Sequence, residues 1–218
     1  ALGPETLWDY LQRFGMGRKT GIELPGEDMG ILRHQKCRGP KDNWCWTPSY
    51  HEYIAFGHEI AATAIQLARA TAVVANGGYL VDPRLIERKF RPLADGSVEE
   101  MPVARAKARR VIKGETSILM RQTMQQVVLQ GTGKRAKISG WTTGGKTGSA
   151  EYGPFLRPGD RQTHSWFVAF APYDDPQIAI VVMVEGGGNA SGVSVPIATD
   201  ILNYYFTRPA PGEAEAAP

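Results

Sequence analysis

The sequence lacks long apolar runs, a strong excess of either charge, and cysteine beyond a single pair. No uninterrupted apolar stretch approaches the ~18 residues that indicate a membrane-spanning helix, so none is predicted. The 25 Lys and Arg against 22 Asp and Glu leave a net charge of +3, and so small a balance argues against a nucleic-acid partner. No basic-then-apolar leader opens the chain, so we expect it to be processed or excised from a longer one.

The two cysteines, Cys37 and Cys45, flank a loop-like run at residues 38–44. Two cysteines without a second cysteine pair do not make a structural zinc site, although His34 and His51 are near in sequence. A metal site is therefore the least favoured reading. A short disulfide loop, which requires an oxidising compartment, and two free thiols both remain open.

Helical periodicity and stop signals predict a series of helices with irregular sequence at 18–53. The helices are expected at 4–14, 60–76, 115–129 and from Ser194, taken as the N-cap, onward. Their expected apolar faces are Ile118, Leu119, Thr123 and Val127 in the third and Ile197, Ile201, Leu202 and Tyr205 in the last.

Apolar and aromatic runs predict strands at 144–151, 165–171 and 177–185, and the short turn at 173–176 makes the last two an antiparallel hairpin. A smaller hairpin is expected around Asp95-Gly96. Helices together with an antiparallel sheet indicate an α+β fold. We expect residues 1–207 to form one domain portion and 208–218, rich in Pro, Ala and Glu, to be a disordered tail.

Residues 140–147, Gly-Trp-Thr-Thr-Gly-Gly-Lys-Thr, match the P-loop pattern of nucleotide-binding proteins. A P-loop needs a helix directly after it, because the N–H groups of the first helical turn bind phosphate. Residues 148–154 contain two glycines and a proline, which form helices poorly. The sequence therefore disfavours nucleotide binding.

The run Lys146-Thr147-Gly148-Ser149 has a second interpretation, as a strand at the edge of an active site. A fixed lysine there attracts an anionic substrate, a hydroxyl donates to a carboxylate, and a glycine lets substrate backbone approach closely. The alternative is a surface turn without function, because a triplet alone is a weak signal.

Longer motifs strengthen the second interpretation. The runs at 2–7, 14–27, 55–59, 63–70, 75–78, 131–133 and 164–172 lie in the order expected for class B, monofunctional penicillin-binding proteins, which the chain resembles over nearly its whole length. The resemblance implies the carboxy-terminal portion of a transpeptidase fold shared with serine β-lactamases. It also implies a peptidoglycan DD-transpeptidase that forms an acyl-serine intermediate and is acylated by β-lactams.

By this resemblance, Lys146 and Ser149 are catalytic, and Lys146, Thr147, Gly148, Ser149 and Ala150 bind substrate. Lys146 faces the substrate carboxylate and supports proton transfer, and the hydroxyls of Thr147 and Ser149 bind that carboxylate. The Ser149 N–H is one of two oxyanion-hole donors. Residues 150–152 continue the strand and pair with bound peptide. Trp141, Tyr152 and Trp166 are candidates to line a cleft, with Trp166 favoured as core.

The nucleophile expected for this chemistry is missing. None of the serines has Lys three residues on or Asn two residues on, so neither the Ser-x-x-Lys nor the Ser-x-Asn motif is present, and an activated serine needs a base beside it. We expect an amino-terminal truncation and an inactive fragment. A β-lactam-sensing or scaffold protein of the same fold, without turnover, is the alternative.

The resemblance also implies partners and a location. The expected partners are peptidoglycan stem peptides, β-lactams, the amino-terminal half of the same domain, and divisome or elongasome proteins, with no cofactor, metal or nucleic acid. The expected location is extracytoplasmic, in the periplasm, held at the inner membrane by an anchor outside this chain.

Overall fold

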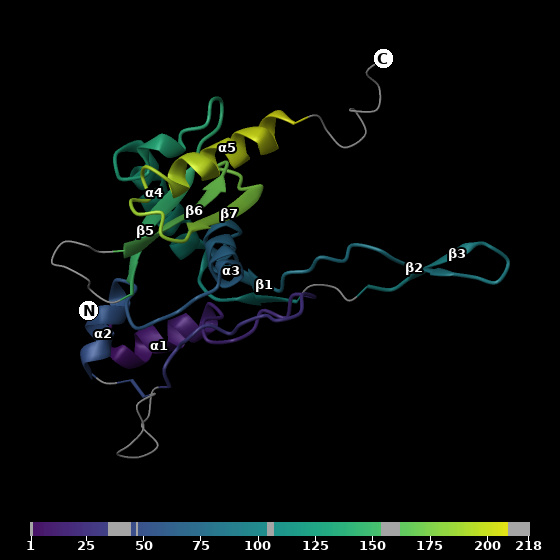
Figure 1. Ribbon diagram of the computed structural model, residues 1–218, viewed down its shortest axis with the longest axis horizontal. Coiled ribbons are helices and arrows are strands. Elements are labelled where there is room, and N and C mark those ends of the chain that lie inside the picture. The colour runs from purple at the N-terminus through teal and green to yellow at the C-terminus, as the bar shows by residue number, and fades with distance from the viewer. Residues whose placement is uncertain (1, 35–44, 47, 104–106, 154–161, 209–218) are drawn as a thin grey trace. The chain divides into compact units, whose positions relative to one another are not determined.

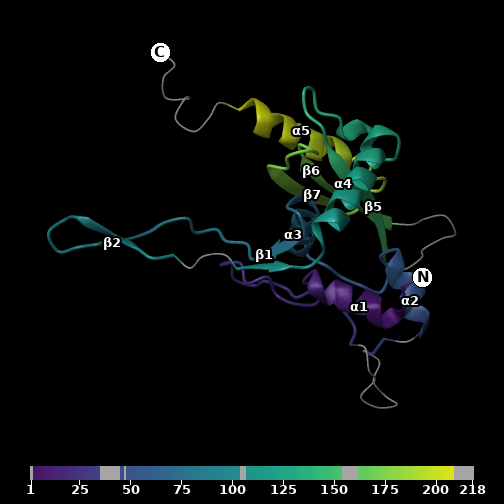
Figure 2. The same ribbon diagram turned by 180° about the vertical axis from the view of Figure 1, so that it is seen from behind.

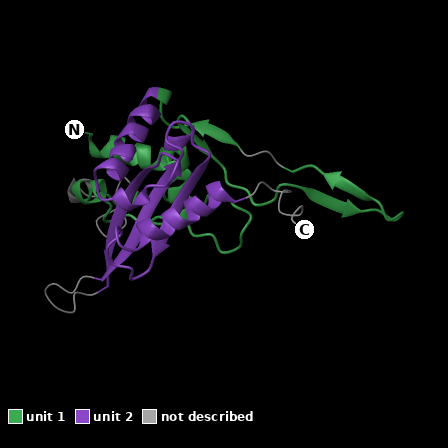
Figure 3. Cartoon of the chain, turned by 90° about the horizontal axis from the view of Figure 1, so that it is seen from above, with its two compact units in different colours: residues 1–73, 77–114 green, residues 74–76, 115–218 purple. Residues whose placement is uncertain are grey.

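The computed structural model describes residues 2–34, 45–46, 48–103, 107–153 and 162–208. The chain divides into two compact units, coloured separately in Figure 3: residues 1–73 with 77–114, and residues 74–76 with 115–218. Most of the predicted tail, residues 209–218, lies outside the described part of the chain.

The first unit carries short elements joined by long loops (Figure 1). They are α1 (Pro4–Arg13), α2 (Pro48–Ala55), α3 (Ala64–Ala75), β1 (Tyr79–Val81), β2 (Lys89–Pro92), β3 (Val98–Met101) and β4 (Ala108–Arg110). Helix α2 begins inside the segment 18–53 that was predicted to be irregular. Strands β1 and β4 pair antiparallel, and a small apolar cluster forms around Val73, Leu80, Val111 and Ile112.

Helix α3 begins at Ala64, four residues after the predicted start at Ile60. The reason is a capping box, in which two residues satisfy each other's free N–H groups. The Thr63 N–H donates to the Gln66 side chain at 2.8 Å, and the Gln66 N–H donates to the Thr63 hydroxyl at 3.3 Å. Because Thr63 holds the N-cap position, the helix cannot extend to Ile60.

The hairpin predicted around Asp95-Gly96 is confirmed as β2 paired with β3. Gly96 has φ 84°, a conformation that glycine adopts without strain. The strands carry exposed charge pairs, Arg88 with Glu100 and Arg91 with Glu99. No residue of β2 or β3 is buried, so among the described residues the hairpin is held mainly by cross-strand contacts.

The second unit is built on a three-stranded antiparallel sheet in the order β5–β6–β7 (Figures 1 and 2). Its elements are α4 (Gly114–Leu129), the short helix η1 (Lys134–Ala136), β5 (Gly144–Tyr152), β6 (Gln162–Ala171), β7 (Ile178–Val184) and α5 (Ser194–Thr207). The three predicted strands and the antiparallel hairpin of the last two are confirmed.

Side chains alternate between the two faces of β6, and each face is covered by helix. Phe167, Ala169 and Ala171 pack with Val195, Ala198 and Leu202 of α5. Phe170, on the opposite face, packs with Met124 of α4 and with Val74. The predicted α+β class, an antiparallel sheet flanked by helices, is confirmed.

The predicted apolar faces of the helices need correction. Helix α4 buries Ser117, Met124 and Val128, while Ile118 and Leu119 are 46% and 63% exposed. The Ser117 hydroxyl donates to the Val74 carbonyl at 2.7 Å, so a polar residue occupies the buried stripe. Helix α5 buries Leu202 as predicted, but it turns Ile197 and Ile201 outward.

Ser194 does not cap α5. It is the first helical residue rather than the N-cap, and it is fully buried. The hydroxyl of Ser165 on β6 donates to the Ser194 hydroxyl at 2.9 Å. The contact therefore joins helix to sheet through a buried polar pair, and the Ser194 N–H at the start of α5 also donates to the Ser165 hydroxyl at 3.3 Å.

Cys45 is disulfide-bonded and buried, and Cys37 lies outside the described residues. Within the described residues, no helix is long and apolar enough to cross a bilayer.

Candidate active site

The residues Lys146-Thr147-Gly148-Ser149 lie in the middle of β5, an edge strand of the sheet. They face Val168, Phe167, Trp166 and Ser165 of β6 in antiparallel register. The segment continues as extended strand to Tyr152, so no helix follows Lys146-Thr147. This geometry excludes the phosphate-binding arrangement of a P-loop.

Two glycines set the position of β5 against the core. A Cβ atom on Gly144 would lie 2.4 Å from the ring of Phe170, and a Cβ on Gly145 would lie 2.6 Å from the ring of Phe167. Real Cβ atoms do not approach other atoms so closely, so both positions require glycine. The strand thus lies directly on two aromatic rings, which fixes the backbone that carries Lys146.

The lysine and the serine of the motif are exposed. The Lys146 amine donates to the carbonyl of its neighbour Thr147 at 2.6 Å. Gly148 lies opposite Trp166, whose Cβ would be 3.3 Å from a Cβ added to the glycine. A cation, a hydroxyl and a bare stretch of backbone are therefore presented along one edge strand.

Thr147 is held by a second threonine. Its Oγ1 lies 2.6 Å from the Oγ1 of Thr132, in the Gly131-Thr132-Gly133 turn after α4. The carbonyl of Thr132 accepts a hydrogen bond from the Ser191 hydroxyl at 2.7 Å, and Ser191 lies in the loop between β7 and α5. The sequence includes this turn among the motifs of the family resemblance, but it does not predict that Thr132 contacts Thr147 or that Ser191 contacts Thr132.

An aromatic pair lies at the far end of β5. The rings of Tyr152 and His164 stack with centroids 3.9 Å apart. The Gly186 N–H donates to Nδ1 of His164 at 3.3 Å. Tyr152, predicted as a cleft residue, is thus half-buried against the neighbouring strand.

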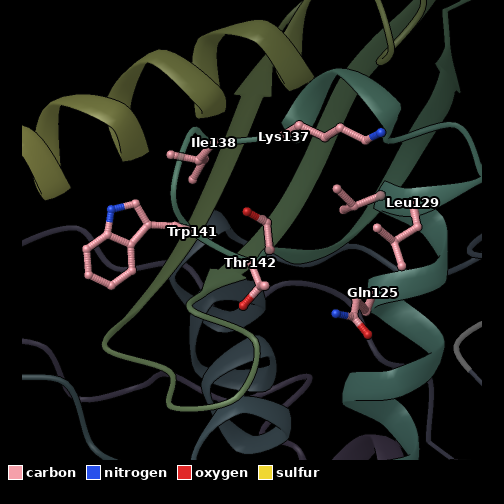
Figure 4. Close-up of a pocket in the computed structure, with 8 residues that line it drawn as sticks. Gln125, Leu129, Lys137, Ile138, Trp141 and Thr142 are labelled. Atoms are coloured by element: carbon pink, nitrogen blue, oxygen red, sulfur yellow. The ribbon is translucent and has the colours of Figure 1, made fainter.

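The other predicted cleft aromatics lie in different surroundings. Trp166 is half-buried rather than fully in the core, and Trp141 stacks on Phe206 with centroids 4.3 Å apart. Trp141 lines a pocket of about 280 Å³ beside α4 (Figure 4), together with Gln125, Val128, Leu129, Lys137, Ile138, Thr142 and Thr143. No residue of the Lys146–Ser149 run lines this pocket.

Within the described residues, no group of three or more His, Cys, Asp or Glu side chains is placed to hold a metal ion. The Lys146–Ser149 run itself contributes the Lys146 amine, the hydroxyls of Thr147 and Ser149, and the strand backbone.

Comparison with known proteins assigns this chain to a family. Residues 1–203 match the family described as penicillin-binding protein transpeptidase domain. The chain is 33% identical over 226 residues to stage V sporulation protein D of Bacillus subtilis, covering 98% of this chain and 33% of that protein. It is 30% identical over 216 residues to the peptidoglycan D,D-transpeptidase MrdA of Acinetobacter baumannii, covering 94% of this chain and 31% of that protein.

Among solved structures, the chain is similar to penicillin-binding protein 3 of Mycobacterium tuberculosis complexed with aztreonam. The TM-score is 0.77 with 30% identity, covering 94% of this chain and 46% of the other. The chain thus spans about a third of the length of the curated relatives it matches.

Proposed function

The chain belongs to the penicillin-binding protein transpeptidase domain family, with class B relatives, and on that premise we propose that the protein containing it is a serine-type peptidoglycan DD-transpeptidase. The observation that carries the proposal is the Lys146-Thr147-Gly148-Ser149 run, which lies on an exposed edge strand pinned to the core by Gly144 and Gly145. Residues 1–207 are its share of the transpeptidase domain.

In the proposed reaction, a serine hydroxyl attacks the D-Ala-D-Ala peptide bond of a stem peptide. The terminal D-Ala leaves, the remaining peptide forms an ester with the serine, and an amine of a second stem peptide takes over the acyl group. A β-lactam acylates the same serine. The relative named as a D,D-transpeptidase and the aztreonam complex of the M. tuberculosis protein support these two steps.

The residues of β5 have distinct roles in this proposal. Lys146 presents a positive charge to the terminal carboxylate of the stem peptide and supports proton transfer. The Thr147 and Ser149 hydroxyls donate to that carboxylate, as charge-assisted hydrogen bonds. The Ser149 N–H supplies one oxyanion-hole donor, and removing such a donor typically costs about 3 kcal/mol of transition-state stabilisation.

Bound peptide lies along the edge of β5 beyond the motif. Gly148 and Ala150 carry little or no side chain, and among the described residues β5 pairs only with β6. An edge strand presents unpaired N–H and C=O groups that an extended peptide can bind. This edge is the proposed subsite for the stem peptide.

The nucleophilic serine and its lysine must come from residues outside these 218, because no Ser-x-x-Lys is present. Ile118, Leu119 and Met120 of α4 are each exposed in this chain. We assign the amino-terminal half of the same domain as its partner.

The wider setting follows from the relatives. The sporulation protein and MrdA support a role in cell-wall synthesis during division or elongation, with the corresponding divisome or elongasome proteins as partners. The reaction belongs outside the cytoplasmic membrane, in the periplasm where one exists, and an inner-membrane anchor outside this chain would hold the protein there.

The missing serine motif also favours a second function, a β-lactam-sensing or scaffold protein of the same fold. Incubating the longer protein and the 218-residue chain with a fluorescent penicillin, followed by a denaturing gel, separates the transpeptidase from a scaffold that is not acylated by β-lactams. The transpeptidase predicts a covalent label on the longer protein and none on the chain alone. An unlabelled longer protein would favour the scaffold, and a labelled chain would overturn the assignment of the nucleophile to other residues.

A further inference from the structure

A hydroxyl that recognises a carboxylate must have its proton free to donate. Thr147 is the hydroxyl assigned to the terminal carboxylate, and its Oγ1 is already in a hydrogen bond of 2.6 Å with the Oγ1 of Thr132. Each hydroxyl has one proton and two lone pairs. The direction of this hydrogen bond therefore decides whether the Thr147 proton is available to substrate.

The direction with Thr132 as donor is the one that leaves the Thr147 proton free. Thr147 then accepts from Thr132 and donates its own proton to the carboxylate. In the opposite direction the Thr147 proton points at Thr132, and the substrate carboxylate meets two lone pairs instead of a donor. Hydrogen bonds arranged head to tail also strengthen one another, so donation by Thr132 strengthens the bond from Thr147 to the carboxylate.

Thr132 is itself fixed from two sides. The N–H groups of Gly131 and Gly133 both donate to the Val127 carbonyl at 3.1 Å, which ties the turn to the end of α4. A Cβ on Gly131 would lie 2.9 Å from the Val127 backbone, so the turn can approach the helix only with glycine there.

From the other side, the Ser191 hydroxyl donates to the Thr132 carbonyl at 2.7 Å. Ser191 is oriented in turn by its own N–H, which donates to the Asn189 side chain at 2.8 Å. Three separate segments, the turn after α4, strand β5 and the loop before α5, therefore meet at the Thr132–Thr147 pair.

We propose that Thr132 is a positioning residue that orients the Thr147 hydroxyl toward an anionic substrate carboxylate, with Ser191 holding Thr132 in place. This inference rests on the proposed transpeptidase function. It assigns to Thr132 a part in selecting carboxylate-bearing ligands, without contact between Thr132 and the ligand. The effect falls on recognition of the carboxylate and not on the reactivity of the serine.

The test compares acylation by a penicillin with its free carboxylate and by the methyl ester of the same penicillin, measured on the longer protein that contains this chain. Thr132→Val keeps the side-chain shape and removes the hydroxyl. It should lower the second-order acylation rate constant for the free acid by up to about tenfold, because the Thr147 hydroxyl keeps its proton but loses the neutral hydrogen bond from Thr132 that turns this proton toward the carboxylate. The rate with the ester should change by less than about twofold.

Two further variants sharpen the test. Thr132→Ser keeps the hydroxyl and should restore the free-acid rate to within about threefold of the unmodified protein. Thr123→Val is the matched control, because Thr123 is an exposed threonine of α4 whose hydroxyl bonds only to the Leu119 carbonyl among the hydrogen bonds of the described residues. It should leave both rates unchanged.

Each outcome bears on one of the two proposals. An unmodified protein that takes no label from either ligand overturns the transpeptidase function itself. With that label present, an unchanged Thr132→Val variant, or an equal fall with acid and ester, overturns the role of Thr132. If thermal melting shows that Thr132→Val does not fold, Ser191→Ala is used instead. It should lower the acylation rate constant for the free acid about threefold and leave that for the ester unchanged. An equal fall for both ligands, or no fall, overturns the proposal.

Discussion

The sheet β5–β7 and the hairpin β2–β3 follow the same antiparallel pairing rule and differ in what their side chains contact. Phe167 and Phe170 of the sheet are fully buried between helices and glycine-bearing strand. Phe90 of the hairpin is 51% exposed and lies under the Arg88 guanidinium at 4.9 Å. The difference teaches that strand pairing alone gives a hairpin, while a rigid edge suited to ligand recognition needs a packed layer beneath it.

Replacing one phenylalanine in each region should give the largest difference in the free energy of unfolding between the two regions. In the longer protein, Phe167→Ala should lower the free energy of unfolding by about 3–5 kcal/mol, because it removes a fully buried ring and leaves a cavity. Phe90→Ala should change it by less than about 0.5 kcal/mol. Urea unfolding of both variants measures the difference, and equal losses would contradict the packing described for the two regions.

The two glycines that begin β5 should give the next largest effect on stability. Gly144→Ala places a Cβ against the Phe170 ring and should cost about 1–3 kcal/mol of stability. The same change at Gly114, where an added Cβ meets nothing within 4 Å, should be neutral or slightly stabilising. Thermal melting of the pair checks this, and a Gly144→Ala protein as stable as the Gly114→Ala protein would show that β5 is not pinned to the ring.

The charge pairs of the hairpin should contribute little to the free energy of unfolding. Arg88 hydrogen-bonds Glu100, which raises the arginine pKa and lowers the pKa of the Glu100 carboxyl, but both side chains are exposed to screening. Glu100→Gln should leave the unfolding midpoint of the longer protein unchanged in 1 M salt. A clear shift that persists in high salt would mean that the hairpin is packed against other structure.

A smaller, pH-dependent effect is expected in the loop of the first unit. The Thr20 hydroxyl, followed by the N–H groups of Thr20 and Gly21, lowers the pKa of Glu27 below its ordinary 4.5. A carboxyl with a lowered folded-state pKa stabilises the fold above its unfolded pKa, and this contribution is lost as pH falls through the folded pKa. The melting temperature of Glu27→Gln should therefore be lower than that of the unmodified protein at pH 7. The gap should narrow as the pH falls through the lowered folded-state pKa of Glu27; a gap independent of pH would contradict this.

The sequence predicted the strands of the sheet more accurately than the faces of the helices. A short apolar run such as 178–184, which lies between turn residues, predicts a strand directly. The motif on β5 is a run of consecutive residues, so a sequence pattern finds it. The apolar face predicted for helix α4 was wrong, because the apolar Ile118 and Leu119 are exposed and the polar Ser117 is buried and hydrogen-bonded to Val74. Which face of α4 is buried depends on the elements that the rest of the fold places beside the helix.

The candidate site shows the same limit. Lys146, Thr147 and Ser149 lie within one four-residue run, so a pattern finds them. Thr132 contacts Thr147 from 15 residues away along the chain, and Ser191 contacts Thr132 from 59 residues away. The Gly131-Thr132-Gly133 turn was visible in the sequence as one of the motifs of the family resemblance. Its contact with β5 depends on the tertiary path from α4 to the sheet, which periodicity does not encode.

The most direct test of the central claim is the rate of acylation by a fluorescent penicillin in the longer protein carrying Lys146→Ala, with Lys137→Ala as control. Both lysines lie in the same unit, and Lys137 lines the pocket beside α4 rather than the edge of β5. We predict that Lys146→Ala lowers the second-order rate constant at least about a hundredfold, the loss expected for a group that stabilises charge in the transition state, while Lys137→Ala leaves it unchanged. An unchanged rate in Lys146→Ala, or an equal fall in both variants, would contradict the assignment of β5 as a wall of the active site.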